Sequence, residues 1–133
     1  TLSKEKWRSF TILNRHRTKA KAIAASLPHR TIAGLTLSTA SFKKAAAHAD
    51  IIIHATSAPL STFDLSCISP SATVIDLHYG PDALPARQSH RFRYIDGTGM
   101  LAHQAALSFA LFTGKTISTA LLRRAIARHL KRV

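Results

Sequence analysis

The sequence predicts an α/β fold in which a parallel β-sheet carries helices on both faces. Two segments, Asp50–Ala55 (DIIIHA) and Thr73–Leu77 (TVIDL), are apolar runs rich in β-branched residues, as is typical of buried parallel strands. Helix-like segments separate the strand-like ones, as the crossovers of a parallel sheet require. With 133 residues, of which 46% are hydrophobic, the chain has the size of one domain with a modest core.

In the first half of the chain, strand-like and helix-like segments alternate. Ser9–Asn14 is short and partly alternating, which predicts a strand, and the Ala/Lys-rich Thr18–Leu27 predicts a helix that ends before a proline. Thr31–Leu37 is a weaker strand candidate because Gly34 interrupts it. Phe42–Ala49 predicts a short helix just before the first β-branched run.

The second half adds one more strand and two longer helices. Phe92–Ile95 predicts a short strand, preceded by one helical turn at Leu84–Ser89. Met100–Phe112 is apolar nearly all round, so we expect a helix that is buried between layers and ends at Gly114. Ile117–Leu130 is amphipathic with a basic face and predicts the last helix.

The chain is strongly basic, with 19 Lys and Arg against 6 Asp and Glu and a net charge of +13. Residues 1–30 carry eight of these cations and residues 115–133 carry six. Such a charge favours an anionic partner, which could be nucleic acid, anionic lipid or a phosphorylated ligand. We treat residues 1–133 as one domain in which 116–133 form a basic C-terminal helix.

Composition also excludes several classes of protein. Cys67 is the single cysteine, so the chain cannot form an internal disulfide. No apolar run approaches the roughly 20 residues of a membrane span. The opening residues also lack the apolar stretch of a signal peptide. We therefore expect a soluble, cytoplasmic protein.

Polar residues follow each predicted strand, which is where doubly wound sheets bind their ligands. After the first strand, the neutral Asn14 is followed by Arg15, Arg17 and Lys19. This pattern suits the 2′-phosphate of a dinucleotide, because a guanidinium can hold a phosphate with two hydrogen bonds. An ordinary basic surface turn before a helix fits the same residues, and the charge pattern leaves both interpretations open.

Four motifs, in order and with sensible spacing, carry a family resemblance. ILNR…K-A, ADIIIHATS, VIDLHYGP and DGTGML…Q…SF…TG lie between about Ile12 and Gly114. Together they resemble the C-terminal, NADP-binding half of the shikimate dehydrogenases. The resemblance implies a Rossmann-like sheet that binds NADP. It also implies hydride transfer between NADPH and 3-dehydroshikimate to give shikimate, with the hydride chemistry carried by the cofactor.

The resemblance implies a role for each matched residue. The positions that would hold the adenosine 2′-phosphate are Asn14, Arg15 and Lys19, with Arg17 beside them. Thr56 and Ser57 match the loop beside the ribose and the pyrophosphate. Tyr79, Gly97 and Met100 match positions near the nicotinamide.

Gln104 matches the glutamine that reaches the hydroxyls of the substrate, and we place Tyr79 on the substrate as well. The family's glycine-rich turn, first strand and N-terminal substrate domain, with its catalytic Lys and Asp, match no segment of the chain. We therefore expect a fragment with no catalytic residue of its own, which is inactive alone and shares its substrate with a missing N-terminal domain. Its sheet would be incomplete at the N-terminus, with two unpaired edges.

Several residues depart from the family's pattern, namely His16, His54, Pro59, Gly80 and Leu84. An imidazole at position 54 could act as a general base, but we interpret His54 as a substituted loop residue. His54 and His78 end neighbouring strands, with Asp50 and Asp76 nearby. A tetrahedral metal site needs three or four donors, and we expect only the two histidines to lie close together. We therefore predict no metal site.

A binding module without catalysis is the alternative from another functional class. The cations of the last helix could lie along the phosphates of a nucleic acid or along another acidic partner: Arg123, Arg124, Arg128, Lys131 and Arg132. Charge runs alone are not specific, and a helix that packs on the domain and presents a solvated basic face is the simpler interpretation.

Overall fold

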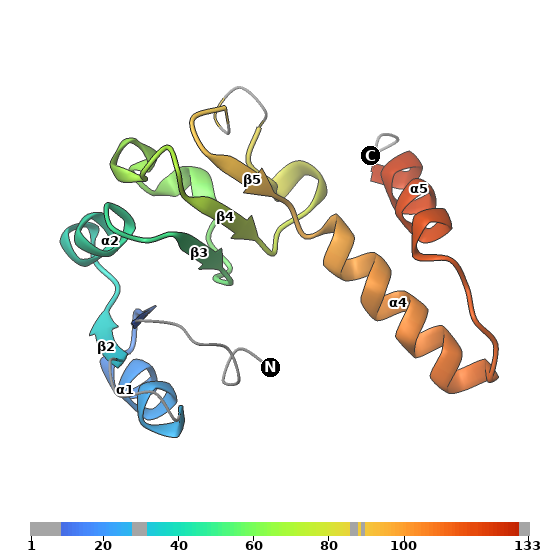
Figure 1. Ribbon diagram of the computed structural model, residues 1–133, viewed down its shortest axis with the longest axis horizontal. Helices are drawn as coiled ribbons and strands as arrows, with labels where there is room; N and C mark the ends of the chain where they lie inside the picture. The colour runs from blue at the N-terminus through green and yellow to red at the C-terminus, as the bar shows by residue number, and fades with distance from the viewer. Residues whose placement is uncertain (1–8, 28–31, 86–87, 89, 131–133) are drawn as a thin grey trace. The chain divides into compact units, whose positions relative to one another are not determined.

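The computed structural model describes residues 9–27, 32–85, 88 and 90–130 (Figure 1). Their contacts divide the chain into two compact units. Unit 1 comprises residues 1–49 and 64–68, and unit 2 comprises residues 50–63 and 69–133. Each unit contains its own parallel sheet.

Unit 1 is built on a β-α-β arrangement. Strand β1 (Phe10–Asn14) and strand β2 (Ile32–Thr36) pair in parallel, and helix α1 (Arg17–Ser26) connects them. Helix α1 packs closely on β2, since a Cβ added at Gly34 would lie 2.7 Å from the carbonyl oxygen of Ala20. The glycine that weakens the strand pattern in the sequence is therefore the residue that lets the helix approach the strand.

Helix α2 (Thr39–Ala46) completes unit 1 and begins at a well-formed cap. The Ser38 hydroxyl accepts a hydrogen bond from the backbone N–H of Ser41, and the Ser41 side chain accepts one from the Ser38 N–H. From the middle of this helix, Lys43 forms a 2.8 Å ion pair with Asp64, which precedes the turn η3 (Leu65–Cys67). Hydrogen bonds from Lys43 and Ser66 lower the pKa of Asp64 to about 2.

Unit 2 contains a three-stranded parallel sheet in the order β3 (Ile51–His54), β4 (Thr73–Asp76) and β5 (Arg93–Ile95). Two further single-turn helices, η2 (Leu60–Thr62) and η4 (Gly80–Asp82), lie in its connections. One face of the sheet is buried and includes Val74, which is fully covered. The other face is more open, since Ile51 and Ile53 on β3 are 40% and 49% exposed. The expectation that β3 is fully buried was therefore wrong, because only one face of this sheet is well covered.

Helices α4 (Thr98–Thr113) and α5 (Thr119–Leu130) follow the sheet and pack on each other. Figure 1 shows α4 extending from the end of β5 and α5 running back. Gly114 ends α4 with a left-handed backbone, φ +67°, as predicted from its place in the sequence. The expectation that α4 is buried between layers was wrong: its C-terminal half is largely exposed, with Leu111 at 82% and Phe112 at 85%.

The predicted fold class is confirmed, because every described strand pairs in parallel and helices alternate with the strands. Within the described residues, β1 and β3 each pair on one side only, as the expectation of two unpaired edges requires. The predicted turn at Leu84–Ser89 includes residues outside the described part of the chain. No helix in the described part has the length and apolar character to cross a membrane.

Candidate functional site

The three strands of unit 2 end level with one another. His54, the last residue of β3, pairs with Asp76, the last residue of β4, and Ile75 pairs with Ile95 on β5. The residues that follow the strands therefore share one edge of the sheet. This is the edge where open α/β sheets bind their ligands.

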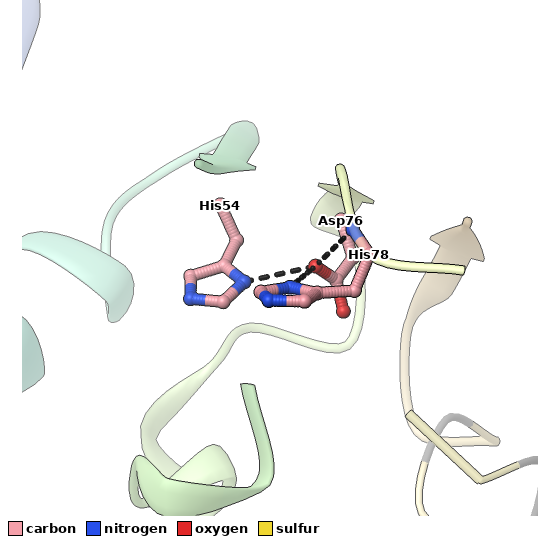
Figure 2. A group of neighbouring side chains, drawn as sticks. All are labelled: His54, Asp76 and His78. Carbon is pink, nitrogen blue, oxygen red and sulfur yellow. Dashed lines mark hydrogen bonds and ion pairs between the residues drawn. The ribbon is translucent and has the colours of Figure 1, made fainter. Parts of the chain in front are cut away.

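A buried polar cluster lies at this edge, and the strand register explains how it forms. His54 and Asp76 are cross-strand neighbours on the same face, and His78 lies two residues beyond Asp76, at the spacing that keeps side chains on one side of an extended chain. Figure 2 shows both imidazoles meeting the carboxylate. Nδ1 of His54 and Nδ1 of His78 each lie 2.9 Å from Oδ1 of Asp76.

Asp76 has no exposed surface and accepts two more hydrogen bonds. The backbone N–H of His78 donates to Oδ1 at 3.1 Å, and the Tyr94 hydroxyl donates to Oδ2 at 3.0 Å. Burial by itself would raise the pKa of Asp76, but the bonds from His54, His78 and Tyr94 outweigh it and hold the pKa below its ordinary value. Asp76 is therefore an ionised acceptor at neutral pH.

Tyr94 extends the cluster to β5 and to the segment after η4. Its hydroxyl oxygen accepts a 2.9 Å hydrogen bond from the backbone N–H of Leu84 while it donates to Asp76. Burial and the neighbouring carboxylate raise the pKa of Tyr94 to about 12, so the phenol stays protonated. Leu84, one of the departures from the family pattern, is itself buried here.

On its other side, His54 contacts the loop that follows β3. Its Nε2 lies 2.8 Å from the Thr56 hydroxyl, and that hydroxyl donates to the carbonyl oxygen of Ala58 at 3.2 Å. The imidazole stacks on the ring of His78 with centroids 5.1 Å apart and meets Phe63 edge-on. His54 is 6% exposed and is the last residue of a strand, so its interpretation as a substituted loop residue was wrong.

The structure places the predicted residues of unit 2 at or near the same sheet edge. Thr56 and Ser57 follow β3, and Tyr79 follows the cluster with 40% of its surface exposed. Gly97 is buried between β5 and α4, and its N–H donates to the carbonyl oxygen of His78 at 2.8 Å. Met100 lies in the first turn of α4, three residues after Gly97.

Gln104 lies one helical turn beyond Met100, so the two exposed side chains share a face of α4. Asp50 lies outside the polar cluster, because it precedes the amino end of β3 whereas His54 ends that strand. Of the two acidic residues that the sequence places near His54 and His78, only Asp76 belongs to the cluster.

The predicted residues of unit 1 gather where β1 meets α1. The Asn14 side chain accepts a 2.9 Å hydrogen bond from the backbone N–H of His16, which turns the chain into the helix. The exposed run that follows carries Arg15, Arg17 and Lys19. The first turn of α1 contains no acidic residue, and the His16 side chain makes no capping hydrogen bond. The start of α1 therefore combines backbone N–H groups that lack a side-chain cap with three exposed cations nearby in the chain.

The cluster as a unit was not predicted from the sequence. Only the two histidines were expected to lie close together, whereas His54, Asp76 and His78 each offer a ligand atom and these atoms all lie within 4.8 Å of one another. Two signals in the sequence point to the cluster. Asp76 and His78 are two residues apart at the end of one predicted strand, and His54 lies at the end of the preceding one. Aligning the two strands by their carboxyl ends would have brought the three residues together.

Two models of known protein families match separate parts of the chain. The family model described as shikimate / quinate 5-dehydrogenase matches residues 1–75. A second model, for the C-terminal domain of shikimate 5'-dehydrogenase, matches residues 97–127.

Curated relatives agree with the family models. The NADP(+) shikimate dehydrogenase of Colwellia psychrerythraea is 34% identical over 118 residues, which is 82% of this chain and 41% of that protein. The enzyme of the same name from Aromatoleum aromaticum is 33% identical over 131 residues, 92% of this chain and 47% of that protein. The chain thus spans less than half the length of these relatives.

Solved structures share the fold. Quinate dehydrogenase from Corynebacterium glutamicum, in complex with NAD, matches with a TM-score of 0.72 and 22% identity over 91% of this chain and 46% of that one. Shikimate 5-dehydrogenase from Thermus thermophilus, in complex with NADP(H) and shikimate, matches with a TM-score of 0.69 and 25% identity over 89% of this chain and 45% of that one. With a family model that covers more than half of its residues, the chain belongs to the shikimate/quinate 5-dehydrogenase family.

Proposed function

We propose that this chain is the NADP(H)-binding part of a dehydrogenase that transfers a hydride between NADPH and 3-dehydroshikimate. The family membership and the names of the curated relatives support the reaction class. The observation that carries the choice of cofactor is the junction of β1 and α1, where three cations are exposed beside uncapped helix N–H groups.

That junction suits a phosphate in two independent ways. The free N–H groups and the dipole at the start of α1 attract an anion, and no acidic side chain in the first turn competes for them. The exposed Arg15, Arg17 and Lys19 add charge-assisted hydrogen bonds. An acidic residue at position 14 would favour binding of a free ribose 2′-hydroxyl. The neutral amide of Asn14 does not repel a 2′-phosphate.

The residues of unit 2 would bind the rest of the cofactor and the substrate. In this proposal Thr56 and Ser57 contact the ribose and pyrophosphate, and Tyr79, Gly97 and Met100 position the nicotinamide. The exposed Gln104, with Tyr79, orients the hydroxyls of shikimate or 3-dehydroshikimate. When bound, the cofactor supplies the hydride, and these side chains bind and orient.

We also propose that the 133 residues bind cofactor without turning over substrate. The resemblance assigns proton transfer to a Lys and an Asp of a domain that they do not match, and the relatives are more than twice as long as the matched region. Turnover would then need a substrate-binding domain supplied in addition to these residues.

Isothermal titration with NADP⁺ and NAD⁺ tests the proposal. We expect NADP⁺ to bind at least about 10-fold more tightly, and Arg15→Ala to weaken NADP⁺ binding about 10-fold, since one charge-assisted hydrogen bond contributes about 1.5–3 kcal/mol. Binding of NAD⁺ should not change. Arg128→Ala, the same substitution on α5, is the matched control and should leave both affinities unchanged. Equal binding of the two cofactors by the unmodified chain would refute the 2′-phosphate site.

One observation favours the alternative of a non-catalytic module for nucleic acid or another acidic partner. Arg123, Arg124 and Arg128 are exposed on α5, while Leu122 and Ile126 on the same helix are half-buried. Lys131 and Arg132 lie outside the described residues. Binding to duplex DNA that weakens with salt and is lost in Arg128→Ala, without discrimination between NADP⁺ and NAD⁺, would favour this alternative.

A further inference from the structure

The polar cluster of unit 2 lies beside the residues proposed to bind the cofactor and has ligand atoms of its own. Two imidazole nitrogens and one carboxylate oxygen converge there, with both Nδ1 atoms 2.9 Å from Oδ1 of Asp76. Of the three residues, Asp76 has no exposed surface and His54 is 6% exposed. A charged group in such a place is stable only if an opposite charge compensates it.

Both imidazoles of the cluster bond to the same oxygen of that carboxylate. The ionised carboxylate of Asp76 only accepts, so Oδ1 is an anionic oxygen that lies between two imidazole nitrogens. The space beside Oδ1 is therefore a place for positive charge, and all three ligand atoms lie within 4.8 Å of one another.

We propose that His54, Asp76 and His78 bind a divalent transition-metal ion of the Zn²⁺ class, which takes the place of the two Nδ1 hydrogens. Two imidazoles and one carboxylate form a donor set that suits Zn²⁺ or Co²⁺, whereas Mg²⁺ and Ca²⁺ prefer oxygen ligands alone. Three protein ligands leave a fourth tetrahedral position open to water or to a ligand.

The present spacing needs little adjustment to hold such an ion. Tetrahedral bonds of about 2.0–2.1 Å set neighbouring ligand atoms about 3.3 Å apart. The two nitrogen–oxygen distances are 2.9 Å, a few tenths of an ångström short of that spacing, and all three ligand atoms lie within 4.8 Å of one another.

The surroundings of the three ligands resemble the outer shell of a metal site. The Tyr94 hydroxyl holds Oδ2 of Asp76 at 3.0 Å and leaves Oδ1 for the ion. On the far side of the ring, Nε2 of His54 lies 2.8 Å from the Thr56 hydroxyl, and the free nitrogen of a metal-binding imidazole commonly bonds to such a polar neighbour.

The experiment titrates Zn²⁺ and Co²⁺ into chelator-treated, folded chain, with calorimetry for Zn²⁺ and visible absorption for Co²⁺. We expect one ion per chain with micromolar or tighter affinity and the intense absorption bands of tetrahedral Co²⁺. His78→Ala should weaken binding by at least about 100-fold, because loss of an outer-shell partner alone costs about 10–100-fold. Asp76→Asn should have the same effect.

The exposed His103 on α4 provides the matched control, since His103→Ala removes an imidazole from the same unit but outside the cluster. This variant should bind like the unmodified chain. If the folded, unmodified chain binds no stoichiometric ion, the proposal is overturned and the cluster is held by protons alone, whether or not the variants fold. Binding that His78→Ala leaves intact, or that His103→Ala abolishes, would also overturn it.

Discussion

At the scale of single residues, the carboxylate of Asp76 organises the edge of the sheet in unit 2. It accepts hydrogen bonds from both imidazoles, from the backbone after β4 and from Tyr94 on β5. It therefore links the ends of all three strands of this sheet. Because the carboxylate is fully buried, its bonds are not screened by solvent and removing the charge should be costly.

Asp76→Asn should reduce the free energy of unfolding by about 3 kcal/mol at about pH 7, since the buried donors around Asp76 lose a charged acceptor. Both carboxylate oxygens of Asp76 accept hydrogen bonds, whereas the amide of asparagine accepts only through its oxygen. Urea unfolding followed by circular dichroism measures the loss. Asp50→Asn, at the exposed amino end of β3, should change stability by less than about 0.5 kcal/mol.

The pH dependence of the same comparison has a definite sign. The pKa of Asp76 is held below its ordinary value of 3.8, so its contribution is complete above that pH and is lost as the pH falls through the folded-state pKa. The stability advantage of the unmodified chain over Asp76→Asn should therefore shrink in strong acid. An advantage that stays constant between about pH 7 and about pH 2 would show that the charge of Asp76 is not what stabilises the cluster.

At the scale of elements, the junction of β5 and α4 depends on a close backbone approach. A Cβ added at Gly97 would overlap the carbonyl oxygen of Leu77 and lie 3.0 Å from that of His78. The Gly97 N–H bonds to the same His78 carbonyl. The missing side chain thus lets the start of α4 pack on the segment after β4, where the predicted nicotinamide residues lie.

Gly97→Ala should therefore destabilise unit 2 by about 1–3 kcal/mol, because backbone atoms must move to admit the methyl group. Gly99→Ala is the matched control, since a Cβ there meets nothing within 4 Å and alanine favours the helix by about 1 kcal/mol. Thermal unfolding of both variants separates the two effects. If both substitutions stabilise the chain, the close approach at Gly97 is not a constraint.

The sequence predicted the strands and most helix ends well because local features determine them. The β-branched runs gave β3 and β4 to within a residue at each end, and Gly114 at φ +67° is the helix end that its position indicated. The exposure of α4 could not be found in this way, since an apolar helix has the same pattern whether or not another element covers it. Leu111 and Phe112 show that it is not covered in this structure.

The polar cluster escaped prediction for a different reason. His54 and Asp76 are 22 residues apart, and they meet only because the register of β3 and β4 is set by pairing along the whole of both strands. Local patterning identified each residue as a strand end, but bringing them together also requires the two strands to be aligned by their carboxyl ends. The family pattern gave no help either, since it treats position 54 as a loop residue.

At the scale of the whole molecule, the net charge is +13, and exposed cations gather at two separate places that could bind an anionic ligand. One is the start of α1 in unit 1, where cations surround uncapped N–H groups. The other is the exposed face of α5 in unit 2, where Arg123, Arg124 and Arg128 have no described acidic partner. We expect the first location, and not the second, to bind the ligand.

Backbone amide chemical shifts, mapped by nuclear magnetic resonance as NADP⁺ and then NAD⁺ are added, distinguish these two locations. We expect NADP⁺ to shift the amides of residues 15–19 and NAD⁺ to leave them unchanged, while both cofactors shift those of Thr56, Ser57 and Gly97. Identical shifts with the two cofactors, or shifts confined to α5, would contradict this expectation.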